Sequence, residues 1–282
     1  MQLKTNNIGK TFSGVNVLRN VDFDLKPGEV HALVGENGAG KSTFVKILSG
    51  VYTPTQGNIL LDEKNVDITT PIVAQRNGVS LIHQEPQSFP HLSVAENIFM
   101  GHMEGNNFSR VKWQDINSKS NEILESIGLK IDPKIIMEGL SIADQQMIEI
   151  AGALSKNSKV LIMDEPTSPL TPNEVGKLFE IVNKLKSNGM AIIFISHRLE
   201  EIRQISDRVT IFRDGDLITT KSINEVTNEE IIKFMIGRNI EETEVKDNEF
   251  IKDDKYVLNV KNLSLSKKFS DISFNLKKGE IL

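Results

Sequence analysis

A chain of 282 residues, of which 39% are hydrophobic and 25% charged, has the composition of a soluble globular protein with one large or two modest domains. The net charge of −5 argues against a nucleic-acid partner, and the lack of cysteine excludes disulfides and thiolate metal sites. The first residues lack the apolar core of a signal peptide, and no apolar run approaches the ~20 residues of a spanning helix. Any role at a membrane is therefore expected to depend on a partner protein.

Short apolar runs alternate with helical patterns along most of the chain. Four runs carry strand signals, at 28–35, 78–84, 159–165 and 190–196. Helical patterns are found between and after them, notably at 42–51, 173–186 and 198–205. The apolar runs suit strands that are buried on both faces of a parallel sheet. The alternation predicts an α/β fold with a mostly parallel sheet.

Two regions depart from this alternation. Residues 91–155 carry helical patterns and little strand signal, so we expect a helical subdomain inserted in the α/β core. Residues 238–255 are rich in acidic and poor in apolar side chains, which is typical of a solvated linker. Residues 1–237 would then form one domain.

The segment after this linker, 256–282, repeats the beginning of the chain. Residues 271–281 match residues 20–30, with Phe, Leu, Lys, Gly and Glu in the same places. A glycine-rich loop follows the first copy at once, whereas the sequence stops before such a loop in the second copy. We therefore expect 256–282 to be the start of a second domain of the same kind, in a truncated version of a chain nearly twice as long.

The loop after the first predicted strand has the pattern G-x-x-x-x-G-K-[ST]. Its glycines let the backbone wrap closely around phosphate oxygens, and the next helix points its positive dipole end at the same place. Lys41 would reach the β- and γ-phosphates of a nucleotide, and the Ser42 hydroxyl would be a ligand of Mg²⁺. The residues expected to bind the nucleotide are Gly35, Glu36, Asn37, Gly38, Ala39, Gly40, Lys41, Ser42 and Thr43.

Polar side chains stand at the carboxyl ends of the other three predicted strands. An acidic pair such as Asp164 and Glu165 is often only a solvated cap, but ligands of open α/β folds bind at this edge of the sheet. Asp164 is placed to hold Mg²⁺, and Glu165 to orient and deprotonate an attacking water. Gln84 would contact the metal or the water, and His197 the γ-phosphate.

These motifs, in this order and spacing, resemble the ATP-binding subunit of an ABC transporter. The resemblance rests on the phosphate loop, Gln84, "LSIADQQ" at 140–146, "MDEPTS" at 163–168 and His197. It implies a P-loop ATPase core that binds ATP and Mg²⁺, with an antiparallel β subdomain beside the main sheet and Phe12 stacked on adenine. It also implies a second ATPase half, in the same chain or in a second copy, that receives a signature made of Leu140, Ser141, Ile142, Ala143, Asp144 and Gln145.

Longer stretches such as "HQEPQSFPHLSVAENIFMG" and "ISHRLEEIRQISDRVTIFRDG" narrow the resemblance to the ATPases of bacterial simple-sugar importers. This class covers ribose, galactoside and xylose, with close relatives that import autoinducer-2, and its members carry two ATPase halves in one polypeptide. The resemblance implies ATP hydrolysis that drives import of a monosaccharide at the cytoplasmic face of the membrane. The partners would be permease subunits, reached near Gln84 and Glu85–Phe89, and indirectly a sugar-binding protein.

Two positions depart from the family pattern. The family signature reads L-S-G-G-Q, whereas Ile142 and Ala143 add side chains where close approach to a γ-phosphate is expected. The site served by this signature should hydrolyse ATP poorly. Pro169 stands where the family usually has a small residue, and proline fixes φ and removes a hydrogen-bond donor.

Three other functions remain open at this point. The first is a truncated ATPase half with weak activity or none. The second is a soluble ABC-type protein that acts on ribosomes, although the predicted linker is short and acidic rather than basic and helical. The third is a P-loop kinase of a small molecule, against which the helical insert, the signature and the repeat all argue.

Overall fold

The computed structural model describes residues 1–102, 111–237, 255–266, 268–280 and 282. The chain divides into two compact units, Met1–Arg238 and Asn239–Leu282. The acidic linker predicted at 238–255 lies outside the described residues except for Lys255. Within the described parts of the chain, no helix is both long enough and apolar enough to cross a membrane.

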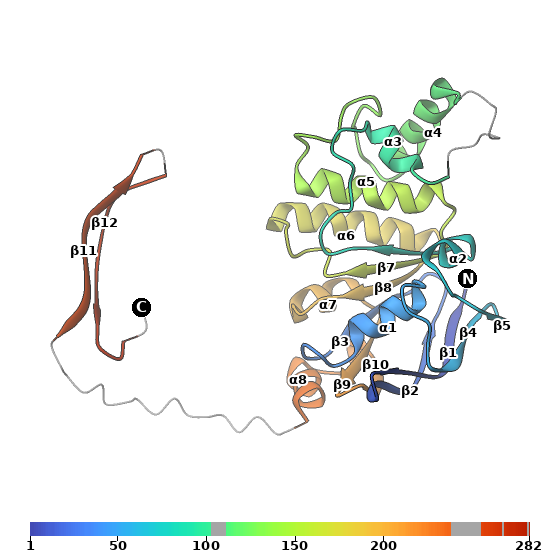
Figure 1. Cartoon of the computed structure of the whole chain (residues 1–282), viewed down its shortest axis with the longest axis horizontal. Coiled ribbons are helices and arrows are strands. Elements are labelled where there is room, and N and C mark those ends of the chain that lie inside the picture. Colours follow the sequence, from blue (N-terminus) through green and yellow to red (C-terminus); the bar gives the residue numbers. More distant parts are fainter. Residues whose placement is uncertain (103–110, 238–254, 267, 281) are drawn as a thin grey trace. The chain divides into compact units, whose positions relative to one another are not determined.

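The first unit is built around a six-stranded sheet with the strand order β10-β9-β3-β8-β7-β6 (Figure 1). Its strands are β3 (Val30–Val34), β6 (Val79–Ile82), β7 (Val160–Asp164), β8 (Ala191–Ile195), β9 (Arg208–Arg213) and β10 (Asp216–Ser222). All neighbouring pairs are parallel except β9 and β10. The prediction of a mostly parallel sheet is confirmed, and the carboxyl ends of β3, β8, β7 and β6 meet at one edge.

A second sheet in this unit is antiparallel and has the order β2-β1-β4-β5. Its strands are β1 (Leu3–Phe12), β2 (Val15–Leu25), β4 (Gln56–Leu61) and β5 (Lys64–Val66). One buried cluster joins its apolar residues to helix α1 (Lys41–Leu48) and to one face of the main sheet. This cluster holds the helix firmly behind the loop that precedes it.

The remaining helices cover the rest of the main sheet and form the inserted subdomain (Figure 1). They are α2 (Pro71–Arg76), α3 (Val94–Phe99), α4 (Trp113–Ser126), α5 (Ile142–Ser155), α6 (Pro172–Ser187), α7 (Leu199–Ile205), α8 (Asn228–Ile236) and the short 3-10 helix η1 (Ile223–Glu225). The helices predicted between 91 and 155 are present as α3, α4 and α5. The helix predicted at 42–51 ends earlier, at Leu48, where Ser49 caps it.

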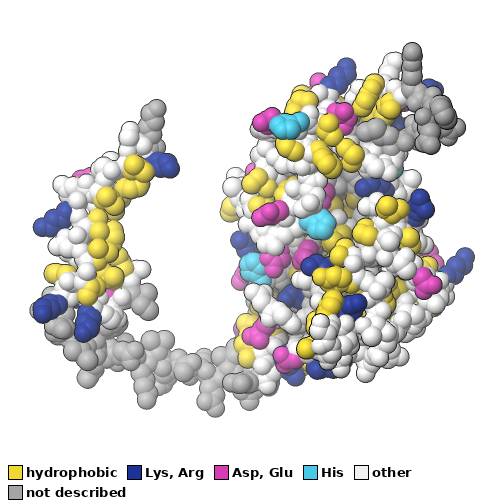
Figure 2. Space-filling view, viewed as in Figure 1, with side chains coloured by type: hydrophobic (Ala, Val, Ile, Leu, Met, Phe, Trp, Pro, Cys, Tyr) yellow, Lys and Arg dark blue, Asp and Glu magenta, His cyan; other side chains and the backbone are white. Residues whose placement is uncertain are grey.

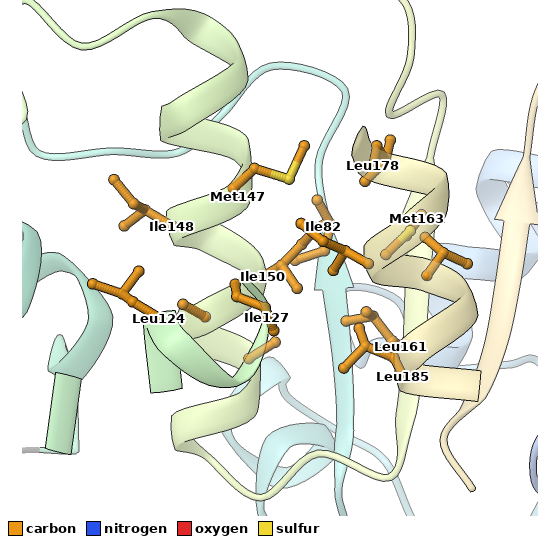
Figure 3. Packing of buried hydrophobic residues seen from close by; sticks show 14 of the residues in the cluster. Ile82, Leu124, Ile127, Met147, Ile148, Ile150, Leu161, Met163, Leu178 and Leu185 are labelled. Carbon is orange, nitrogen blue, oxygen red and sulfur yellow. The ribbon is translucent and has the colours of Figure 1, made fainter. Parts of the chain in front are cut away.

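A second buried cluster joins the helical subdomain to the main sheet (Figure 3). Side chains of α5, among them Met147 and Ile150, meet Ile82 of β6, and Leu178 of α6 lies on the other side. Along β7, Leu161 and Met163 enter this cluster, while Val160 and Ile162 enter the cluster on the opposite face. The period-two alternation explains why β7 must be apolar throughout.

The second unit is a hairpin of β11 (Tyr256–Leu265) and β12 (Phe269–Lys277) that repeats β1 and β2 in its backbone as well as its sequence. The left-handed residues Asn7 and Asn20, with φ of 51° and 45°, recur as Asn262 and Asp271, with φ of 52° and 56°. The registers also correspond, since Leu3 opposes Leu25 as Leu258 opposes Leu276. The hairpin exposes a row of hydrophobic side chains (Figure 2), which include Tyr256, Val257, Leu258, Leu263, Leu265, Phe269 and Ile272.

Candidate nucleotide site

The loop between β3 and α1 is packed tightly on one side and open on the other. A Cβ atom on Gly35 would lie 2.4 Å from the carbonyl oxygen of Phe212, and one on Gly40 would lie 2.6 Å from Leu18 Cδ2. Gly38 has a left-handed φ of 84°, and a Cβ there would meet nothing within 4 Å. The loop is therefore packed against the protein at both ends, while its middle borders open space. The first N–H groups of α1, which have no partner within the helix, follow this loop directly.

Lys41 lies at the start of α1 and reaches back across this loop. Its Nζ donates hydrogen bonds to the carbonyl oxygens of Gly35 at 2.6 Å and Glu36 at 3.0 Å. Burial lowers the pKa of the Lys41 ammonium, and the nearby carboxylates of Glu165 and Asp164 oppose this effect. Within the described residues, the hydrogen bonds of the ammonium go to these two carbonyl oxygens, so a phosphate group could compete for it.

Asp164 is the last residue of β7, and Glu165 follows it in a left-handed conformation with φ of 49°. The Glu165 N–H donates to the carbonyl of Ile195 at 3.0 Å, which ties this turn to the end of β8. Burial, and then the charge of Glu165, raise the pKa of the Asp164 carboxyl. Two adjacent, half-buried carboxylates form a place where a cation would be stabilised.

Gln84 and His197 lie on either side of Glu165. The Gln84 Nε2 donates to Glu165 Oε2 at 3.3 Å, and His197 Nδ1 lies 3.5 Å from Glu165 Oε1. Both residues were expected at the ends of strands, but β6 ends at Ile82 and β8 at Ile195, so each lies two residues beyond its strand. The sheet edge sets their location, and loop geometry sets their direction.

The end of the loop, the start of α1 and the acidic pair line a cavity of about 350 Å³, whereas Gln84 and His197 are not among its lining residues. Its lining comprises Val17, Asn37, Gly38, Ala39, Gly40, Lys41, Ser42, Thr43, Asp164, Glu165 and Ile195. Sequence reasoning missed Val17, which lies on β2 and carries no chemical signal. Among the described residues, no cluster of three or more His, Asp or Glu side chains could hold a metal unaided. The Ser42 and Asp164 oxygens suit Mg²⁺, which usually takes one or two carboxylates together with substrate phosphates and waters.

Phe12 lies at the end of β1 and is not among the residues that line this cavity. Its ring is 37% exposed and packs edge-on against Tyr52, with 5.2 Å between the ring centroids. The Nζ of Lys10 lies 5.0 Å from the Phe12 centroid. The exposed ring could still receive a flat partner, so adenine stacking stays a prediction.

The signature residues form the amino-terminal end of α5. Ser141 is the N-cap, and its hydroxyl accepts from the Asp144 N–H and donates to the Asp144 carboxylate. Ile142 is 52% exposed, whereas Ala143 is 8% exposed and packs in the core. The expectation that both side chains stand in the way of a partner is corrected, because only Ile142 projects from the surface.

Pro169 lies in a turn that follows Glu165. The two backbone hydrogen bonds of this turn are donated by Ser168 to Glu165 at 3.2 Å and by Leu170 to Thr167 at 3.1 Å. Proline can replace the usual small residue here because neither hydrogen bond needs its missing N–H.

Comparison with known proteins shows a match to the model of the ABC transporter family over residues 18–168. A ribose import ATP-binding protein of Streptomyces avermitilis is 44% identical over 280 residues, which are 99% of this chain and 55% of that protein. A putative ribose/galactose/methyl galactoside import ATP-binding protein of Rhizobium meliloti is 45% identical over 280 residues, 99% of this chain and 54% of its own length. The chain thus spans about half the length of these relatives.

Solved structures show the same fold. An ATP-binding cassette of an ABC transporter in its ADP conformation has a TM-score of 0.74 and 26% identity, and the match covers 84% of this chain and all of that one. A nucleotide-free cassette from an ABC transporter has a TM-score of 0.72 and 26% identity, over 84% of this chain and 96% of the other.

Proposed function

The chain belongs to the ABC transporter family, and from this premise we propose that it binds and hydrolyses ATP to drive import of a monosaccharide or a related small sugar. The observation that carries the proposal is the convergence of Lys41, Asp164 and Glu165 on one cavity behind a phosphate-type loop. The names of the ribose and galactose import relatives support the sugar class. The partners proposed are a second ATPase half and permease subunits, through which the chain would be held at the cytoplasmic face of the membrane.

The phosphates of ATP would occupy the open side of the loop at Gly38. Lys41 would exchange its two carbonyl acceptors for phosphate oxygens, and the first N–H groups of α1 would donate to the same phosphates. Ser42 and Asp164, with Gln84 at the edge, would hold Mg²⁺, which neutralises phosphate charge when it is bound. Phe12 would then lie on the side of the site from which adenine enters.

Hydrolysis would proceed by in-line attack of water on the γ-phosphorus, with the bond to ADP breaking. Glu165 is the proposed base, because its carboxylate oxygens lie between Gln84 on one side and His197 on the other. Gln84 would orient the water, and His197 would contact the γ-phosphate. The signature at Leu140–Gln145 would serve the site of the other ATPase half, with Ile142 limiting its approach.

The phosphate role of Lys41 is the first element to test. Lys41→Ala removes charge-assisted hydrogen bonds worth about 1.5–3 kcal/mol, so the affinity for Mg-ATP should fall by a factor on the order of 10 to 100. Titration of a fluorescent ATP analogue into both proteins measures the change. Lys184→Ala, on the exposed side of α6, is the matched control and should bind like the parent. Equal affinities for Lys41→Ala and the parent would overturn the nucleotide assignment.

A further inference from the structure

Glu201, on the first turn of α7, has a buried side chain that binds two separate loops. Its residue is 8% exposed. Oε2 accepts hydrogen bonds from the hydroxyls of Thr167 and Ser196, both at 2.7 Å. Oε1 accepts from Nη1 of Arg198 at 3.2 Å. One carboxylate therefore connects the turn after Glu165 with the residues on both sides of His197.

Further contacts close this connection into a ring. The Arg198 N–H donates to the Ser196 hydroxyl at 3.0 Å, so Ser196 both donates and accepts. On the opposite side, the Glu165 N–H donates to Ile195 at 3.0 Å, and the Glu165 carboxylate faces His197 at 3.5 Å. The His197 side chain itself is exposed, so its position depends on this contact with Glu165 and on its neighbours in the chain.

The burial of Glu201 is not explained by the needs of its own helix. An acidic residue in the first turn of a helix interacts favourably with the helix dipole, and the exposed Glu200 already supplies one. A buried carboxylate costs free energy unless its hydrogen bonds are satisfied. Among the described residues, the hydrogen-bond partners of Glu201 are Thr167, Ser196 and Arg198, which lie in the two loops that carry Glu165 and His197.

We propose that Glu201 is a positioning residue that fixes His197 relative to Glu165 by holding Thr167, Ser196 and Arg198 on one carboxylate. A displacement of the turn at 165–170 is thereby transmitted to the backbone at 195–199, and the reverse also holds. The consequence for hydrolysis rests on the proposed function, but the mechanical connection does not. A carboxyl group has two oxygens that accept hydrogen bonds, so one can serve two hydroxyl donors while the other faces a guanidinium.

Three substitutions break the connection at different points without altering Glu165 or His197. Thr167→Val and Ser196→Ala each remove one hydroxyl donor, and Glu201→Gln places an amide where only acceptors fit. Thr210→Val is the matched control, because Thr210 is also fully buried and its hydroxyl bonds to His31 and Thr220, within the main sheet.

Hydrogen exchange of the 282-residue chain, followed by mass spectrometry of its peptides, tests the connection without requiring catalysis. Thr167→Val should speed exchange at 195–199, and Ser196→Ala should speed exchange at 165–170, each by at least about threefold, as expected for coupled neighbours in one network. Glu201→Gln should speed both, and Thr210→Val neither. If Thr167→Val and Ser196→Ala each change only their own loop, the proposal is wrong.

Steady-state ATP hydrolysis by the protein in the assembled transporter tests the catalytic consequence. The kcat of each of the three variants should fall by about tenfold, the effect of one lost hydrogen bond to a charged group, while KM for ATP stays within about twofold. A parent protein that binds ATP but releases no phosphate would refute the proposed hydrolysis, and the exchange data would still decide the role of Glu201. An equal loss of kcat in Thr210→Val would assign the effect to general stability and overturn the positioning role.

Discussion

Glu149 of α5 provides a prediction whose size follows from the structure. Burial raises the pKa of its carboxyl from 4.5 to about 7, against the opposing effects of the His83 and Gln87 backbone amides and the charge of Lys156. Its Oε2 is buried and has no hydrogen-bond partner among the residues that the structure describes. The side chain lines a cavity of about 240 Å³ between α5 and the loop that carries Gln84. At neutral pH and above, the folded protein therefore keeps a charge in an unfavourable place.

The cost is obtained from the difference between the folded pKa of about 7 and the ordinary value of 4.5, which is about 2.5 units. At 1.36 kcal/mol per unit this amounts to about 3 kcal/mol. A raised folded pKa of an acid destabilises the fold above that pKa, and the penalty disappears as pH falls towards the unfolded value. The penalty is thus fully present at pH 8 and falls below about 1 kcal/mol at pH 5.

Glu149→Gln should accordingly stabilise the first unit at pH 8, because the amide carries no charge. The gain should be about 2–3 kcal/mol, somewhat less than the full penalty, because Lys156 loses its acidic neighbour. For a unit of this size the melting temperature should rise by roughly 5–10 °C. At pH 5 the parent and the variant should nearly coincide.

Thermal and urea denaturation at both pH values, followed by circular dichroism, measure this difference. Glu180→Gln is the matched control, because Glu180 is exposed on α6 and its replacement should change little at either pH. The reasoning is refuted if Glu149→Gln gives the same change at pH 5 and pH 8, or if it destabilises the protein at pH 8.

Two further predictions concern the site and the sheet beside it. Glu165→Gln should leave ATP bound while the rate of phosphate release falls by a factor of about 10²–10⁴, as expected for the loss of a general base. If this variant hydrolyses ATP at the parental rate in the assembled transporter, Glu165 is not the base. Burial lowers the pKa of His31 below its ordinary 6.5. As pH falls below 6.5, the imidazole therefore becomes protonated in the unfolded chain while it stays neutral in the folded one. The free energy of unfolding should then fall by up to about 1.4 kcal/mol per pH unit. His31→Gln, measured in the Glu149→Gln background between pH 7 and 5, should flatten this dependence, and unchanged steepness would count against it.

Much of the fold was predictable because its signals are local. The buried strands are short apolar runs, and β7 enters opposite clusters with alternate residues, which leaves no place for a polar side chain before Asp164. The repeat was also visible, and the structure adds its physical basis: left-handed residues at Asn7 and Asn20 set bulges in the pairing of β1 and β2, and polar residues that tolerate this conformation recur at Asn262 and Asp271.

The candidate site was predictable in its composition but not in its supports. Lys41, Asp164 and Glu165 could be predicted from a loop motif and a strand end. Val17, which lines the cavity, and Tyr52, which packs against Phe12, are ordinary residues whose positions depend on how distant elements pack. The direction of each signature side chain was not predictable either. The rotation of about 100° between consecutive helical residues turns Ala143 into the core while Ile142 stays at the surface, and the packing of α5 on the subdomain decides which of them is buried.

Two acids, the half-buried Glu149 on α5 and the buried Glu201 on α7, have similar surroundings that no motif reveals. The parallel sheet brings the ends of its strands together, yet Gln84 and His197 lie two residues beyond those ends, where the ladder of strand hydrogen bonds no longer fixes the chain. At each place a carboxylate on a helix faces the backbone of the loop: Glu149 lies beside residues 83 and 87, and Glu201 binds the residues on both sides of His197. The strands therefore determine where the polar residues are, the loops beyond the strand ends set their direction, and we expect the carboxylates on the helices to hold those loops. A substitution in either helix should alter the site without touching any residue that contacts the nucleotide.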